Sequence, residues 1–368
     1  MWNRCRRHWK CIAWAVGAVA ASLLLVGLSR GDTGFAQWYA THLFPVFPNT
    51  IGRILSPIPF SVYEFALYAL VLAVPVCAAV IGWGLLRRRP WGKRVCFAIC
   101  RVVFCAAPAV LLMLTLTCSV NYGRTPFGEE AGYLMQDSSA DELEALCEEL
   151  AEQAREYAKQ IPLNETGGLS LAQTDLSAQT KAAMSALGQQ YPSLAGYYPN
   201  PKPVAWSRGM SQLRLTGMFS PFTIEANYNQ DIPDYEIPYT VCHELAHLKG
   251  YIREDEAGFI AYLACRESGD PVLGYSGALN ALSYAMGALS RTGRMESYAR
   301  IYQSLPQQAK IDYQTSNAYW QQFESKVAEV SNALNDSYLK ANAQSDGVQS
   351  YGRMVDLLLA ERRTRTVQ

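Results

Sequence analysis

Three long apolar runs near the start of the chain constrain its fold more than any other feature. Residues 11–28 form 18 residues without a charge, which is about the shortest stretch that crosses a bilayer as a helix. Residues 62–86 and 95–119 form two longer runs. Residues 121–368 mix acidic and basic residues as an ordinary soluble domain does. The sequence therefore predicts a membrane domain of three transmembrane helices over residues 1–120, followed by a second domain.

Basic residues indicate how these spans are oriented. Four of them precede the first run, and the segment RRRPWGKR (87–94) separates the second run from the third. Because basic residues gather in cytoplasmic loops, the N-terminus and segment 87–94 are expected in the cytoplasm. Three crossings then place residues 121–368 outside it, anchored to the cell membrane. A basic start with an apolar run also describes a cleaved signal peptide, but two further spans favour an uncleaved anchor.

Composition excludes two classes of site. Lys+Arg and Asp+Glu number 32 each, so no global basic field exists to attract nucleic acid. None of the ten cysteines forms a CxxC pair, which argues against a four-cysteine zinc site. Cys242 and Cys265 could form a disulfide in an oxidising compartment, although two buried thiols is the interpretation that we favour.

Periodicity predicts a mainly α, α+β second domain with a small sheet. Residues 138–160 repeat leucines at helical spacing, and Ser139 with Glu142 forms a capping box. Residues 203–228 alternate β-branched and aromatic residues between Gly and Pro, which is typical of short strands. Further helices are expected at about 174–190, 236–249, 254–268, 271–290, 293–304, 307–341 and 347–363.

The motif His-Glu-Leu-Ala-His at residues 243–247 points to zinc chemistry. His243 and His247 lie four residues apart, so a helix brings both rings to one face, where they can bind one zinc ion. Glu244 between them can act as the general base of a metallopeptidase. Two of the chain's four histidines fall in this short pattern, which argues against the alternative of two structural histidines.

A catalytic zinc site needs a third protein ligand, and an acidic cluster follows the motif. Residue 253 is Arg, which cannot bind zinc, whereas Glu254 and Glu256 both could. We favour Glu254, with Glu256 as the alternative and Asp255 as the least suitable. Acidic residues also favour the dipole of a helix N-terminus, which accounts for those that do not bind metal.

The motif and the acidic helix after it resemble the gluzincin metallopeptidases, in which a Glu three residues before an Ala is the third zinc ligand. Aligned in this way, Glu254 is the ligand and Ala257 matches. Gly258 replaces the acidic or amide residue that often supports a ligating histidine in that group. The resemblance implies a zincin-like fold in which the residue that supports a ligating histidine differs from the usual one.

A closer resemblance extends over nearly the whole chain. The three N-terminal spans and three blocks are similar to a bacterial family of predicted membrane zinc metallopeptidases, catalogued as a domain of unknown function. The blocks are PFTIEANYN (221–229), CHELAHLKGYIREDEAGF (242–259) and DGVQSYGRMVDLLLA (346–360). This resemblance implies a fold and a metal site but no particular substrate.

Peptide hydrolysis is the reaction that these residues predict. Zn²⁺ would polarise a water molecule, and Glu244 would take its proton and pass it to the leaving amine. The developing oxyanion needs a second donor, for which Tyr351 and Arg253 are the candidates. Residues 219–229 could offer an edge strand to an extended peptide or protein substrate, or could simply pack in the core.

Two other functions fit the same motif. A zincin-like domain of low or lost activity could serve as a sensor that binds a peptide or a cell-envelope fragment, and Gly258 favours this alternative. The intact Glu244 opposes it, because a structural zinc site needs no general base. A hydrolase of non-peptide amides also fits. The expected partners are a substrate and the lipid bilayer.

Overall fold

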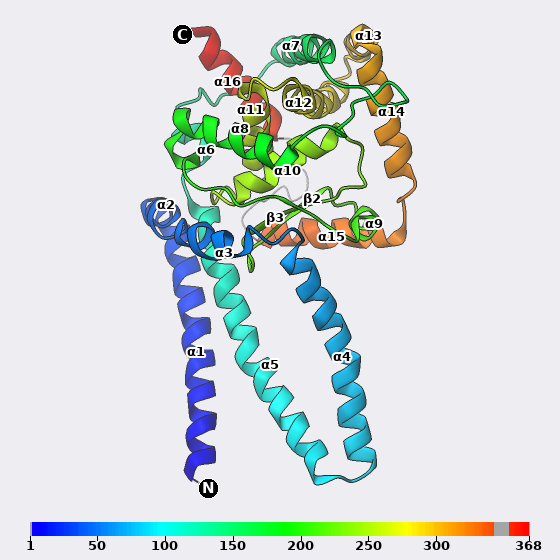
Figure 1. Cartoon of the computed structure of the whole chain (residues 1–368). Helices are drawn as coiled ribbons and strands as arrows, with labels where there is room; N and C mark the ends of the chain where they lie inside the picture. The colour runs from blue at the N-terminus through cyan, green and yellow to red at the C-terminus, as the bar shows by residue number, and fades with distance from the viewer. Residues whose placement is uncertain (1, 342–352, 368) are drawn as a thin grey trace.

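Three apolar helices extend from one side of a helical domain (Figure 1). The computed structural model describes residues 2–341 and 353–367. The three helices are α1 (Trp2–Gly31), α4 (Val62–Leu86) and α5 (Pro90–Thr117). Each is long and apolar enough to cross a membrane, which confirms the prediction of three such helices.

Small residues bring the apolar helices together. Ala15 and Ala18 of α1 are buried against its neighbours, and Trp14 donates a hydrogen bond of 3.1 Å to the backbone carbonyl of Cys105 in α5. Near the turn that joins α4 to α5, Gly84 and Gly92 touch so closely that a Cβ on Gly92 would lie 2.7 Å from a backbone carbon of Gly84. Toward the helical domain, α4 and α5 diverge (Figure 1).

The segment between α1 and α4 folds onto the helical domain. It contains α2 (Thr33–His42), the π-helical turn η1 (Pro48–Gly52) and α3 (Arg53–Leu55). Tyr39 and Phe44 are buried with Val120, and the amide of Asn200 donates to the hydroxyl of Ser56 at 2.9 Å. These contacts attach the segment between α1 and α4 to the helical domain, although it precedes the domain boundary expected at residue 120. That residue lies inside η2 (Ser119–Gly123), directly after α5.

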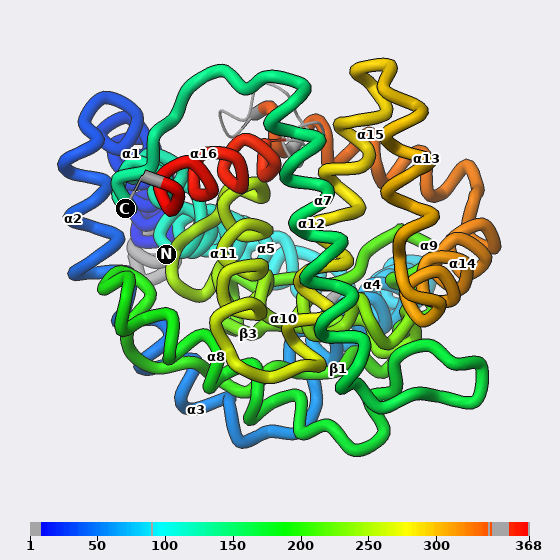
Figure 2. Tube along the Cα trace, turned by 90° about the horizontal axis from the view of Figure 1, so that it is seen from above, coloured from blue at the N-terminus to red at the C-terminus, as the bar shows by residue number. Residues whose placement is uncertain are grey.

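Buried helices that pack against one another form the core of the domain. At its centre are α10 (Glu236–His247), α11 (Glu254–Glu267) and α12 (Pro271–Arg291), packed against α7 (Ala140–Ala158), α8 (Leu176–Gln190) and α16 (Met354–Val367) (Figure 2). Both hydrogen bonds of the predicted Ser139–Glu142 capping box are present at the start of α7. The remaining helices are α6 (Phe127–Glu130), η3 (Pro192–Leu194), α9 (Ser207–Gln212), α13 (Met295–Ser304), α14 (Gln307–Gln321) and α15 (Lys326–Ala341).

Three short strands form the sheet, in the order β1-β3-β2. They are β1 (Lys202–Pro203), β2 (Gly217–Ser220) and β3 (Glu225–Tyr228). Strand β3 pairs in parallel with β1 and antiparallel with β2, so β2 is an edge strand. The predicted run of strands is interrupted by α9, whose first turn is held by a 2.7 Å hydrogen bond from the Ser207 hydroxyl to the carbonyl of Val204.

One predicted helix is two helices. The expected helix over 307–341 is broken between α14 and α15, and Phe323 in the break is buried. Its ring packs 5.2 Å from the ring of Tyr319, so burial of this side chain accompanies the change of direction seen in Figure 1. The helix expected at 347–363 is α16 within the described residues, and its predicted start lies outside them.

Two buried carboxylates join α4 to the sheet. Glu225 of β3 accepts hydrogen bonds from the first amides of α4, Val62 at 3.1 Å and Tyr63 at 2.9 Å, and also pairs with Lys202 of β1. In return, Glu64 of α4 accepts hydrogen bonds of 2.8 Å from the two amides that precede α9. The free amides of a helix N-terminus need such partners, so α4 and the sheet form one unit.

Replacing Glu225 with Ala should destabilise the protein strongly. The change leaves the ammonium group of Lys202 buried without its charge partner and uncaps α4, and breaking a buried pair costs about 3–5 kcal/mol. The measurement is unfolding of the full chain in detergent, followed by tryptophan fluorescence. Glu156→Ala is the matched control, because Glu156 and Lys159 pair at 2.6 Å with both side chains exposed. Equal losses in the two variants would contradict a structural role for the Glu225 contacts.

Candidate metal centre

A tight connection between α10 and α11 brings three potential metal ligands together. His243 and His247 lie on α10, and Glu254 is the first residue of α11. Between them, Gly250 adopts a φ of +80°, which favours glycine. A Cβ at Gly250 would also lie 3.2 Å from the side-chain oxygen of Asn121, so both backbone angle and space require glycine here.

The three side chains converge through atoms that can bind a metal. The Nε2 atom of His243 lies 2.9 Å from Oε2 of Glu254, and the Nε2 atom of His247 lies 3.8 Å from the same oxygen. All three ligand atoms lie within 4.8 Å of one another. Tetrahedral zinc with bonds of about 2.0–2.1 Å places its ligands about 3.3 Å apart, so these residues fit such an ion.

The backbone orients the ring of His247. Its Nδ1 lies 2.7 Å from the carbonyl oxygen of Tyr251, which can only accept a hydrogen bond. The proton is therefore on Nδ1, and Nε2 presents a lone pair toward Glu254. Burial lowers the pKa of His247 to about 4, which keeps the ring in the neutral form that binds metal.

Glu244 is buried beside the cluster with one oxygen unsatisfied. Its Oε2 has no hydrogen-bond partner among residues 2–341 and 353–367, and burial raises the pKa of its carboxyl group to about 8. Gly217 of β2 makes room for it, because a Cβ there would lie 2.8 Å from Cγ of Glu244 and 2.8 Å from a methyl carbon of Thr240. A buried polar atom without a partner is costly, so this oxygen is available to accept a hydrogen bond from a bound water or ligand.

The other acidic and basic candidates lie elsewhere. Glu256 accepts a 2.9 Å hydrogen bond from the amide of Phe127 and is not part of the cluster, so Glu254 is the carboxylate beside the histidines. Arg253 pairs with Asp255 at 3.1 Å and is not among the described residues that line the cleft around the cluster. Tyr351 lies outside the described residues.

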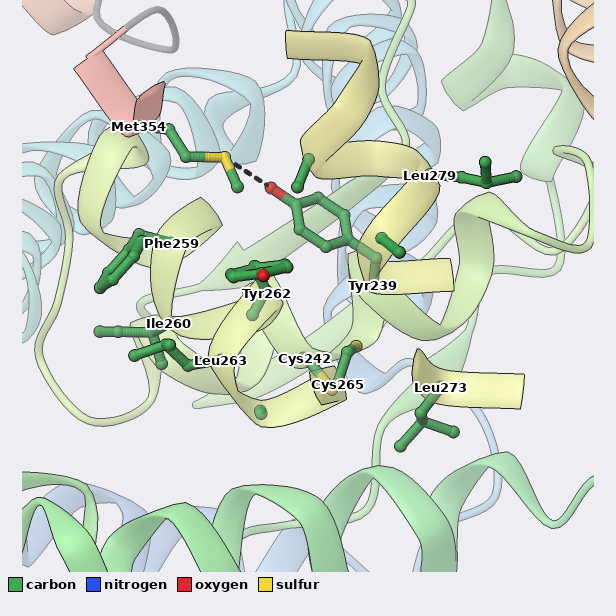
Figure 3. Close-up of a cluster of buried hydrophobic side chains, with 14 of the residues drawn as sticks. Tyr239, Cys242, Phe259, Ile260, Tyr262, Leu263, Cys265, Leu273, Leu279 and Met354 are labelled. Atoms are coloured by element: carbon green, nitrogen blue, oxygen red, sulfur yellow. Dashed lines mark hydrogen bonds between the residues drawn. The ribbon is translucent and has the colours of Figure 1, made fainter. Parts of the chain in front are cut away.

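The space at Gly258 is occupied by a tyrosine. A Cβ at this position would lie 2.8 Å from the hydroxyl oxygen of Tyr239 and 3.2 Å from the sulfur of Met354. That hydroxyl donates a hydrogen bond of 3.3 Å to the sulfur (Figure 3). A larger side chain at position 258 would therefore have to displace the hydroxyl of Tyr239.

A cleft of about 770 Å³ surrounds the cluster. Residues 217–219 of β2 form one wall, and the cleft is also lined by Tyr122 and Tyr284, which no sequence pattern singles out. Tyr284 lies 41 residues after His243, on a helix whose apolar spacing only indicates packing. Cys242 and Cys265, on the neighbouring helices, are buried free thiols in the core shown in Figure 3, as we favoured.

Comparison with known proteins identifies one family. No curated protein and no solved structure matches the chain. The family described as "Protein of unknown function (DUF3810)" matches residues 39–359, which include the sheet, the α10–α11 connection and most of the described domain. The expected membership of a family with no assigned function is confirmed. Because this match covers most of the chain, the protein belongs to that family of unknown function.

Proposed function

We propose that the chain is a membrane-anchored zinc metallopeptidase with a zincin-like domain that hydrolyses peptide bonds outside the cytoplasm. The observation that carries the proposal is the convergence of His243, His247 and Glu254, with the unsatisfied carboxylate of Glu244 beside them. Three protein ligands with an open position are typical of catalytic zinc sites, whereas structural sites use four.

The chain's own groups divide the work of hydrolysis. Zinc, when bound, supplies a Lewis acid that polarises the scissile carbonyl and acidifies water. Glu244 takes the proton of the attacking water and returns it to the leaving amine. Its position suits this role, because the carboxylate is buried beside the metal-ligand candidates and its Oε2 has no partner among residues 2–341 and 353–367, so it can accept that proton.

The edge strand and a tyrosine complete the site. Strand β2 pairs on one side with β3 and lines the cleft, so an extended substrate can add to its other side through backbone hydrogen bonds. Tyr284 reaches the same cleft from α12, and no hydrogen bond to its hydroxyl is found among the described residues. We assign this hydroxyl the role of second donor to the oxyanion.

The arrangement of charges supports an extracytoplasmic domain. Segment 87–94, with its five basic residues, lies at the end of α4 and α5 that is remote from the helical domain (Figure 1). The first turns of α1, which carry four basic residues, lie at that end as well (Figure 1). Since basic residues favour the cytoplasmic face, the helical domain belongs on the opposite face.

Zinc binding should depend on the side chain of Glu254 and not on that of Glu256. The purified full chain, dialysed after zinc loading, should hold one zinc ion, and Glu254→Ala should weaken binding by more than about 100-fold. Glu256→Gln is the matched control and should keep the metal, since Glu256 bonds the amide of Phe127. Elemental analysis by mass spectrometry measures the ratio. Absence of zinc from the unmodified chain, or an unchanged zinc content in the Glu254→Ala variant, would refute the site.

Replacing Glu244 with Gln should abolish hydrolysis and leave the metal in place. The amide cannot accept the proton of the attacking water, so cleavage of fluorescently labelled casein should fall by about 10²–10⁴-fold. Zinc content, measured in parallel, should not change. Binding of casein without cleavage by the unmodified, zinc-loaded chain would instead favour the sensor alternative.

Replacing Tyr284 with Phe tests the second donor. Loss of the hydroxyl should lower kcat for casein by about 10²-fold with little change in KM, because the bond forms to the transition state. Tyr298→Phe, a partly buried tyrosine outside the cleft, is the control. A change in KM alone would show that Tyr284 only holds substrate.

A further inference from the structure

The cleft reaches the ends of the apolar helices. Tyr63, the second residue of α4, lines it together with His243 and Glu254. Cys118, which directly follows α5, and Tyr122, which lies in η2 just beyond it, line the cleft as well. One turn of a helix rises about 5.4 Å, so this wall lies within about one or two turns of the point where the apolar spans begin.

The two apolar helices beneath the cleft are separated on that side. They touch beside their connecting turn, where the rings of Trp83 and Trp91 lie 5.6 Å apart, and diverge toward the helical domain (Figure 1). Within α4, all of whose residues are described, Glu64 and Gly84 are the buried ones. The long middle of α4 therefore presents apolar side chains to lipid or to another apolar helix.

Helix α15 adds an apolar surface at the same level. It runs along the edge of the helical domain nearest the apolar helices (Figure 1). Val327, Val330 and Leu334 are exposed on it, and their spacing of three and four residues places them on one side. Ser331 and Asn335 on a neighbouring side line the cleft. A helix with an exposed apolar stripe beside membrane spans is suited to lie in the membrane interface.

We infer that the site takes its substrate from the membrane: a polypeptide anchored by an apolar helix, cut within about ten residues of the bilayer surface. This inference rests on the proposed peptidase function. An extended chain advances about 3.3 Å per residue, so about ten residues lead from the bilayer through a cleft that starts at the span ends. Anchoring also raises the effective concentration of that segment at the site.

The lining of the cleft suits such a segment. The cleft is lined by Met218 and Phe219 of β2, by Phe222 of the turn after it, and by Ile252 of the α10–α11 connection. Segments that leave a membrane are rich in apolar and aromatic residues, which these side chains can receive. Backbone pairing with β2 would hold such a segment without requiring one particular sequence.

Three substrates test the inference with the full chain in phosphatidylcholine vesicles. Each carries one 20-residue block that contains every amino acid once. In the first, the block directly follows an apolar 20-residue helix. In the second, a 40-residue EAAAK spacer, about 60 Å long when helical, separates them. The third is the block alone. Mass spectrometry follows cleavage, and the two anchored chains have equal surface densities.

The first substrate should be cut at least about tenfold faster than the second, since only its block reaches the cleft from the bilayer. Equal cleavage of all three substrates would overturn this inference and leave the peptidase function intact. Failure of the zinc-loaded chain to cut any of them would overturn the peptidase function itself.

A variant of α15 provides a second test. Val330→Asp with Leu334→Asp should lower cleavage of the first substrate about tenfold and leave cleavage of the free block unchanged, because charges on the stripe oppose contact with lipid. Glu329→Gln, on a different side of the same helix, is the matched control. An unchanged rate for the anchored substrate would overturn the membrane contact of α15.

Discussion

The buried carboxylate of Glu225 is the contact on which the relation between membrane helices and site depends. It accepts the first amides of α4, pairs with Lys202 and stands at the start of β3, which pairs in turn with the edge strand that lines the cleft. Lys202 also donates to the carbonyl of Leu55 at 2.9 Å, so α3 joins the same cluster. In water these groups would be solvated, and in the interior they satisfy only one another. The sheet, and with it one wall of the cleft, is therefore fixed to the end of an apolar helix.

The grouping of His243, His247 and Glu254 depends on a different constraint, which is the geometry of the short connection between α10 and α11. The left-handed Gly250 ends α10 and lets the chain return so that Glu254 faces the histidines one turn away. The same connection supplies the Tyr251 carbonyl that orients His247. The ring of Tyr251 is held in turn by the guanidinium of Arg124, 3.7 Å from its centre. Because Arg124 follows α5 after the single turn of η2, the contact that supports the cluster is joined to an apolar helix by a short stretch of chain.

Local patterns predicted most of the helices, and contacts between distant segments account for the misses. Residues 140–158 form a helix whose capping box and apolar face both depend only on residues within that one segment. The break near Phe323 and the short helix α9 depend on what packs against those segments, and periodicity within one segment carries no record of its neighbours. The contacts of residues 32–61 with the helical domain likewise depend on segments that are distant in the chain. Position and the gluzincin resemblance favoured Glu254 over Glu256, but both fall on the first turn of α11, and it is the packing of that helix that puts Glu254 beside the histidines.

The sequence by itself determined that three apolar helices precede a mainly helical domain, and that two histidines share one helix face with a glutamate directly after the first of them. These features follow from residue spacing, which fixes neighbours along a helix whatever surrounds it. Only the tertiary structure decided which carboxylate completes the cluster, that Tyr284 shares the cleft, and that the cleft opens beside the apolar spans. Those outcomes depend on side chains far apart in the chain, whose positions are set by the packing of whole elements.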